Sequence, residues 1–256
     1  MRMKKWASAA ACRILKLAGN PSTVEEAVAI VAERLLEGVQ SPPTDLEALM
    51  PRLNVTAFEP DATLPISGEL RKDGDGFKIV YSASLSQGRQ RFTLAHELAH
   101  AVFESTGPNC PRYGRELERI CDMLAGEILL PKQIFLKAVG EKVTPGRICQ
   151  LARDFQTSLM ATAIRSCNLC RVSVFQVENG HLTWGYGLIK SKHDLEGDRL
   201  AFQTAIHQAM AGIPGERLVF LKRRELLLQW TCMRGSSRAM FVLRSHDTTG
   251  RPVSSV

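Results

Sequence analysis

The sequence predicts a mixed α+β fold, and two kinds of pattern support this class. Apolar residues recur at helical spacing in several segments, of which residues 22–38, 89–104 and 115–130 are the longest. Other segments alternate in the manner of strands and meet at hairpin turns, at residues 73–76 and 178–180. The chain therefore combines helices with short strands that we expect to pair locally.

The elements follow one another along the chain with clear boundaries. The first amphipathic helix begins at a capping box from Ser22 to Glu25. The expected helices are residues 22–38, 45–53, 89–104, 115–130, 146–155, 158–167 and 202–213. The expected strands are residues 54–59, 68–72, 77–82, 172–177, 181–188, 217–222, 226–232 and 239–244. The order β-β-α-β-β-β at the end of the chain predicts a small α+β module.

Composition excludes several classes of protein. The 256 residues, 45% hydrophobic and 23% charged, suit one large or two small globular domains rather than a disordered or collagen-like chain. Uncharged apolar stretches fall short of the roughly 20 residues of a membrane span, so no membrane association is expected. Arg13 and Lys16 interrupt the apolar part of the N-terminus, which favours a basic helix or tail over a signal peptide.

Cysteine count and charge point to the compartment and to a class of partner. Seven cysteines, an odd number, in a chain without an export signal favour a reducing, cytoplasmic setting. The net charge of +7 divides into +5 over residues 1–20, −3 over 21–166 and +5 over 167–256. Basic ends are compatible with a polyanionic partner.

The strongest chemical signal is the HExxH motif His96-Glu97-Leu98-Ala99-His100. Residues four apart lie about one turn apart on the same face of a helix, so both imidazoles project together. Two nitrogens in this arrangement can bind one Zn²⁺ ion, and Glu97 beside them fits the role of general base. The sequence therefore predicts a catalytic zinc site on the helix at 89–104.

A catalytic zinc site needs a third protein ligand and one open position. The candidate carboxylates are Glu104, Glu116, Glu118 and Glu127. Glu104 lies about 12 Å along the helix axis from His96, which is too far for a shared ion. Glu118 lies on the next helix with Asp122 on the same face, whereas the other two point to the opposite side as solvated charges. Asp122 is either an acceptor for a ligand histidine or an ordinary surface acid.

Four segments together form a recognisable pattern of motifs. They are PPTDLEALMPRLNV, SGELRKDGDGFKIVYS, RQRFTLAHELAHAVFE and ELERICDMLAGEILLP. The last two carry the HExxH helix and then Glu118, Cys121 and Asp122, which run into Leu129-Leu130-Pro131. In these segments the chain resembles the ImmA/IrrE metallo-endopeptidases of bacteria and their mobile elements, over about residues 22–166. The resemblance implies that His96, His100 and Glu118 bind zinc and that Glu97 is the base.

The resemblance also implies an organisation into domains and a biological role. It implies a zincin-like (thermolysin-type) catalytic domain at 22–143 after a basic N-terminal helix or tail at 1–21. A helix-turn-helix-like connector at 144–167 and a GAF-like sensory module at 168–256 would follow. Family members cleave a DNA-binding helix-turn-helix repressor and so switch on a stress or mobile-element operon. Two alternatives are a non-cleaving zinc-containing regulator that binds a repressor and a DNA-binding regulator; the intact Glu97 argues against the first.

Cysteines outside the HExxH motif raise further questions. Cys110 lies between prolines in the loop that joins the two ligand-bearing helices, so its thiolate is a candidate inhibitory zinc ligand or an ordinary loop residue. Cys167 and Cys170 form a lone CxxC motif, and without a partner pair we expect ordinary thiols there.

Other residues suggest binding and catalytic roles that the sequence leaves open. Basic and aromatic residues interleave in the C-terminal module, as in proteins that bind single-stranded nucleic acid, although a core role for the aromatics is equally expected. The basic residues are Lys222, Arg223, Arg224, Arg234, Arg238 and Arg244, and the aromatic ones are Trp184, Tyr186, Trp230 and Phe241. For stabilisation of the oxyanion, Tyr81, Tyr113 and His181 are candidates.

Overall fold

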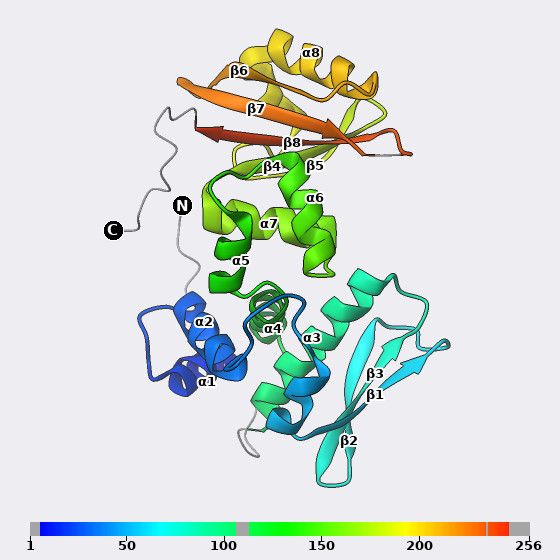
Figure 1. Ribbon diagram of the computed structural model, residues 1–256. Helices are drawn as coiled ribbons and strands as arrows, with labels where there is room; N and C mark the ends of the chain where they lie inside the picture. The colour runs from blue at the N-terminus through cyan, green and yellow to red at the C-terminus, as the bar shows by residue number, and fades with distance from the viewer. Residues whose placement is uncertain (1–5, 106–112, 234, 246–256) are drawn as a thin grey trace. The chain divides into compact units, whose positions relative to one another are not determined.

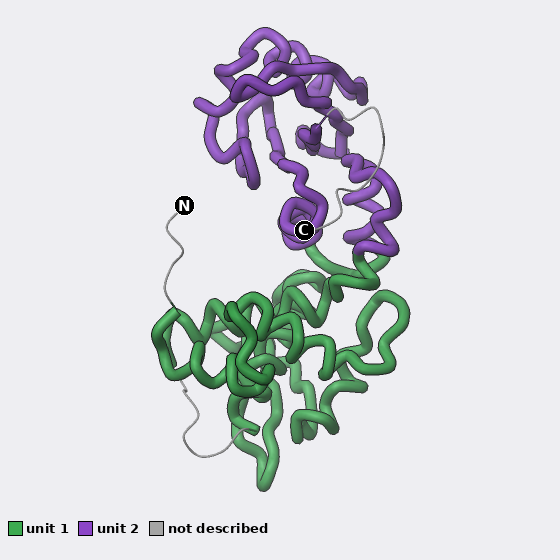
Figure 2. Tube along the Cα trace, turned by 90° about the vertical axis from the view of Figure 1, so that its left-hand side faces the viewer, with its two compact units in different colours: residues 1–135, 154–158 green, residues 136–153, 159–256 purple. Residues whose placement is uncertain are grey.

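The computed structural model describes residues 6–105, 113–233 and 235–245, and these form two compact units. Unit 1 comprises residues 1–135 and 154–158, and unit 2 comprises 136–153 and 159–256 (Figure 2). The expected α+β class is confirmed, because both units combine helices with a sheet (Figure 1). Within the described residues, no helix is long and apolar enough to cross a membrane.

Unit 1 contains a three-stranded sheet with a long helix packed against it. The strands are β1 (Val55–Asp61), β2 (Gly68–Asp73) and β3 (Gly76–Ser82), in the order β1-β3-β2. β2 and β3 form the predicted hairpin, whose turn uses the positive φ of Gly74. β1 pairs with β3 in parallel, so β2 pairs with only one neighbour and forms an edge of the sheet.

The helices of unit 1 pack around this sheet and around one another. They are α1 (Ala9–Ala18), α2 (Val24–Leu35), the 3₁₀ helix η1 (Glu47–Leu53), α3 (Gln87–Glu104) and α4 (Arg115–Leu129). α3 contacts all three strands and packs along α4 (Figure 1). α4 buries a stripe at helical spacing, from Leu117 through Cys121 and Leu124 to Ile128. This burial holds the HExxH helix and the helix of Glu118 side by side.

The residues after Pro131 form a helix that the sequence pattern did not predict. It is α5 (Lys132–Val139), where Phe135 is fully buried and its ring lies 5.6 Å from that of Phe155. Eight residues are too few to show a clear helical period in the sequence. A helix this short is stabilised by tertiary packing. The two helical patterns that follow are present as α6 (Pro145–Asp154) and α7 (Leu159–Cys170).

Unit 2 contains a five-stranded antiparallel sheet in the order β5-β4-β8-β7-β6. Its elements are β4 (Ser173–Glu178), β5 (His181–Tyr186), η2 (Lys192–Asp198), α8 (Arg199–Met210), β6 (Gly215–Leu221), β7 (Arg224–Cys232) and β8 (Arg238–Ser245). α8 covers one face of the sheet and buries Phe202, Ala205 and Ala209 there, while α7 contacts β4 (Figure 1). α8 is shorter than expected: it ends before Gly212, which has a positive φ, and Ile213 is exposed.

Candidate metal centre

The two histidines and Glu118 converge on one point in unit 1. The Nε2 atoms of His96 and His100 lie 3.1 Å apart. The carboxylate oxygens of Glu118 lie 3.3 Å from Nε2 of His96 and 3.6 Å from Nε2 of His100. Helical spacing of four on α3 aligns the imidazoles, and the packing of α4 along α3 supplies the carboxylate.

These separations fit a single tetrahedral metal ion. Three donors that each lie about 2.0–2.1 Å from a Zn²⁺ ion are about 3.4 Å from one another. Two imidazole nitrogens and one carboxylate form the ligand set of many catalytic zinc sites, which keep one coordination position open. Among the described residues this is the one group of three that could hold a metal ion, and it includes neither Glu104 nor Glu127. The donor set therefore fits zinc.

Asp122 orients one of the imidazoles. Its Oδ1 lies 2.9 Å from Nδ1 of His96, on the ring edge opposite the converging nitrogens. When Nδ1 donates its proton to this carboxylate, Nε2 presents a lone pair toward the metal position. Burial lowers the pKa of His96, but the hydrogen bond to Asp122 and the nearby carboxylates outweigh burial and leave that pKa above its ordinary value.

Glu97 lies beside the metal position in a buried setting. It is 8% exposed, and burial raises its pKa to about 7, while the positive form of His96 and the backbone N–H of Leu70 act in the opposite direction. A divalent cation at the three donors would add a charge that favours the ionised form of Glu97. With such a cation bound, Glu97 would be a carboxylate beside the metal position that could accept a proton.

A residue that sequence reasoning missed allows this close packing. A Cβ atom built on Gly68 of β2 would lie 2.4 Å from Cγ2 of Thr93 on α3 and 3.6 Å from Cγ of Glu97. Only glycine lets the edge strand approach the HExxH helix so closely. The quoted segment SGELRKDGDGFKIVYS contains this glycine, but its role depends on which helix covers the strand.

A cavity of about 550 Å³ opens in front of the metal position. Its lining residues are Ile66, Gly68, Glu69, Leu70, Lys72, Phe77, His96, Glu97, His100, Glu104, Tyr113 and Glu118. Four of them belong to β2, so the edge strand forms one wall beside the metal position. The size lies in the range of sites that bind small molecules or short peptide segments.

The remaining predicted residues have different positions. Tyr113 lines the cavity and is 91% exposed, whereas Tyr81 lies on β3 outside the lining and His181 lies on β5 of unit 2. Cys110 lies outside the described residues, so the role assigned to it stays a prediction. Glu116 remains accessible to solvent, and in addition its Oε2 accepts hydrogen bonds from the backbone N–H groups of Ala7 and Ser8.

The aromatic residues of the C-terminal module divide into two groups. Trp230 and Phe241 are buried against α8 in the core of unit 2, so they are not available to stack on bases. Trp184 is partly exposed and Tyr186 is 40% exposed, both on the edge strand β5. The expectation of a core role is thus correct for the first pair.

The fold and the donor set together define a class of protein, a mixed α+β protein with an HExxH-type metal centre typical of metallopeptidases. Residues 50–166 match the family model of Peptidase_M78, the IrrE N-terminal-like domain. This segment is therefore similar to the IrrE N-terminal-like peptidase domains, and the predicted ImmA/IrrE resemblance is confirmed.

The comparison with solved structures extends the likeness beyond this segment. A structure described as a Mycobacterium tuberculosis transcriptional regulator superposes with a TM-score of 0.55 and 17% sequence identity. The match covers 90% of this chain and 91% of that chain, and at this identity it concerns the fold alone. No curated protein matches the chain.

Proposed function

We propose that the chain is a zinc-dependent endopeptidase that cleaves a helix-turn-helix transcriptional repressor. The observation that carries the catalytic part is the convergence of His96, His100 and Glu118, whose potential ligand atoms lie 3.1–3.6 Å apart, beside the buried Glu97. These three residues would hold the metal, and Glu97 would be the base. The match of residues 50–166 to a peptidase family model supports the same function.

The residues of the chain supply the proton transfers of peptide hydrolysis. Zinc, when bound, would contribute Lewis-acid chemistry toward the scissile carbonyl. A carboxylate oxygen of Glu97 accepts a proton from the attacking water, and the same group then donates it to the leaving amine. The close packing of Gly68 against α3 would hold Glu97 near the metal position for both steps.

The edge strand suggests how a peptide substrate is bound. β2 pairs with β3 on one side only, and its other side borders the cavity beside the metal position. An extended peptide can add to such an edge by main-chain hydrogen bonds. A repressor segment in this position would run past His96 and His100 with its backbone exposed to Glu97.

The proposal includes the domain organisation expected from the sequence. We assign a zincin-like catalytic domain to 22–143, a helix-turn-helix-like connector to 144–167 and a GAF-like regulatory module to 168–256. The six cysteines of the described residues are all free, which supports a reducing, cytoplasmic setting. The description of the mycobacterial structure as a transcriptional regulator supports a role in gene regulation.

The test is a cleavage assay in which the candidate substrates are helix-turn-helix proteins, sought first among the products of the neighbouring genes. Glu97→Gln should keep the fold and bound zinc but reduce cleavage by about two orders of magnitude or more, because it removes a positioned general base. Glu47→Gln, an exposed change on η1, is the matched control and should cleave like the wild type. Cleavage by Glu97→Gln at a rate near wild type would refute Glu97 as the base. If the wild type itself does not cleave the repressor, the non-cleaving regulator is favoured.

We further propose single-stranded nucleic acid as the trigger, acting on the C-terminal module. The net charge of +5 over residues 167–256 and the exposed rings on β5 support it. Lys222 and Arg238 are already paired with Asp194 and Glu178, which leaves fewer cations for phosphates.

Titration of a fluorescent oligonucleotide with the full chain tests this trigger. The affinity should fall steeply as salt rises, and Tyr186→Ala should weaken binding. Tyr113→Ala, an exposed tyrosine of unit 1, is the matched control. An oligonucleotide that does not bind at low salt would exclude the trigger, and equal loss in both variants would place the binding site elsewhere.

A further inference from the structure

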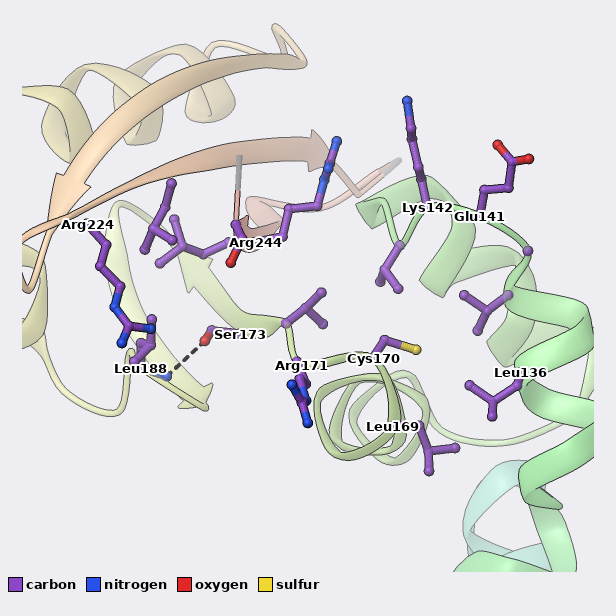
Figure 3. Close-up of a pocket in the computed structure, with 17 residues that line it drawn as sticks. Leu136, Glu141, Lys142, Leu169, Cys170, Arg171, Ser173, Leu188, Arg224 and Arg244 are labelled. Atoms are coloured by element: carbon purple, nitrogen blue, oxygen red, sulfur yellow. Dashed lines mark hydrogen bonds between the residues drawn. The ribbon is translucent and has the colours of Figure 1, made fainter. Parts of the chain in front are cut away.

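Unit 2 contains a second cavity, of about 520 Å³, that the proposed peptidase chemistry does not use. Its walls come from the end of α5 and the loop after it, the end of α7, and the ends of β4, β7 and β8 (Figure 3). Every lining residue belongs to unit 2. The volume lies in the range of small-molecule sites.

The walls of this cavity are largely apolar. The apolar lining side chains are Leu136, Val139, Val143, Leu169, Val172, Leu188, Leu226 and Leu243. Most are buried in the fold, but Leu136 and Leu188 remain 37% and 36% exposed. Apolar side chains that line a cavity and stay open to solvent gain free energy when an apolar ligand covers them.

Four cations and one acid border the same cavity. They are Lys142, Arg171, Arg224 and Arg244, with Glu141 as the acid. Figure 3 shows Arg224 beside Leu188 on one side and Lys142 beside Glu141 on the other. Arg244 lies 3.5 Å from Oε1 of Gln229 through its Nε atom. Among the described residues, no ion pair or side-chain hydrogen bond engages Lys142, Arg171 or Arg224.

Unpaired cations around apolar walls select one class of ligand. A neutral apolar molecule would leave the cations without a partner, and a small inorganic anion would leave the apolar walls uncovered. We propose that this cavity binds an organic anion with an apolar body, whose carboxylate or phosphate group meets the cations of the rim. Guanidinium groups suit both head groups because they can donate two parallel hydrogen bonds.

The experiment measures binding of decanoate and decyl phosphate to the full chain by calorimetry, with decanol and inorganic phosphate as partial ligands. We expect the amphiphilic anions to bind and the two partial ligands to bind weakly or undetectably. Whichever amphiphile binds more tightly identifies the head group. The readout does not depend on peptidase activity, so the outcome is independent of the proposed function.

Variants then test the site itself. Arg224→Gln should weaken binding of the amphiphilic anion about tenfold or more, because it removes a charged hydrogen-bonding partner. Leu188→Ser should also weaken binding of the anion, because it removes an apolar contact with the body of the ligand. Arg199→Gln, on α8 outside the lining, makes the same change of charge and should leave the affinity unchanged.

Several outcomes would overturn the inference. Equal binding of decanol and decanoate would show that the cations do not contribute to binding. Binding of inorganic phosphate without binding of the amphiphilic anions would show that the apolar walls do not contribute. Unchanged affinity in Arg224→Gln and Leu188→Ser would place the ligand elsewhere. Displacement of bound decanoate by a short oligonucleotide at these cations, with tighter binding of the oligonucleotide, would assign the site to nucleic acid instead.

Discussion

At the scale of single residues, position decides which carboxylate joins the two histidines at the proposed metal centre. Glu104 and Glu118 both line the cavity in front of the metal position, and both are glutamates within reach of bulk water. Glu118 alone lies with the two histidines, because α4 carries it across to the middle of α3, whereas Glu104 lies two turns along α3 from His96. Position on the helices, rather than residue type, therefore distinguishes the proposed ligand Glu118 from its neighbour Glu104.

The two glutamates form a matched pair for a test of zinc binding. Glu118→Gln should lower the amount of zinc that co-purifies, measured by elemental analysis, because an amide is a poorer ligand than a carboxylate. Glu104→Gln should leave zinc unchanged. Full occupancy in Glu118→Gln would show that a different residue completes the site.

At the scale of elements, the N-terminal helix is anchored to the helix that carries Glu118. The carboxylate of Glu116 accepts two backbone hydrogen bonds at the start of α1, at 3.2 Å from Ala7 and 2.9 Å from Ser8. The guanidinium carbon of Arg119 lies 4.7 Å from the ring centre of Trp6. Both contacts come from the first turns of α4, so α1 restrains the segment that positions Glu118.

The pKa of Glu116 gives this anchor a predictable pH dependence. The hydrogen bonds from Ser8 lower that pKa below its ordinary value. The carboxylate therefore stabilises the folded state above the pKa of the unfolded chain, and this contribution is lost as pH falls through the folded pKa.

Thermal unfolding of a Glu116 variant tests the anchor. Glu116→Gln should unfold at a lower temperature than the wild type at neutral pH, and the difference should shrink as the solution becomes acidic. Glu33→Gln, on the exposed side of α2, should match the wild type throughout. A Glu116→Gln difference that grows in acid would contradict the assigned hydrogen bonds.

At the scale of the whole molecule, the proposed metal stabilises one unit and not the other. His96 and His100 on α3 and Glu118 on α4 all belong to unit 1, and unit 2 has a separate core under α8. A ligand that binds only the folded state stabilises it by about 2.7 kcal/mol when its concentration is about 100 times Kd. This stabilisation should therefore appear in unit 1, which contains the three proposed metal ligands.

Hydrogen exchange with and without zinc measures this distribution. Zinc added to the chelator-treated protein should slow exchange in α3 and α4 and leave β7 and β8 nearly unchanged. The Glu118→Gln variant should show no zinc-dependent protection. Equal protection of both sheets, or protection that persists in the variant, would refute a metal site confined to unit 1.

Patterns that are local in the sequence determined much of this protein. The HExxH spacing predicted two imidazoles on one face because helical geometry fixes side chains four residues apart, and the structure has them 3.1 Å apart. The hairpins and most helices follow from turn residues and hydrophobic period in the same way. Residues 132–139 escaped prediction because eight residues carry too little periodicity and depend on the packing of Phe135.

Only the tertiary structure decided the features that join distant segments. The parallel pairing of β1 with β3, the approach of Gly68 to Thr93 and Glu97, and the cavity in unit 2 each bring together residues far apart in the chain. No local pattern encodes these contacts, because they depend on which apolar faces meet when the elements pack. The sequence alone determined the α+β class and the two histidines that share one helix face, while packing decided what surrounds Glu97 and where an organic anion would bind.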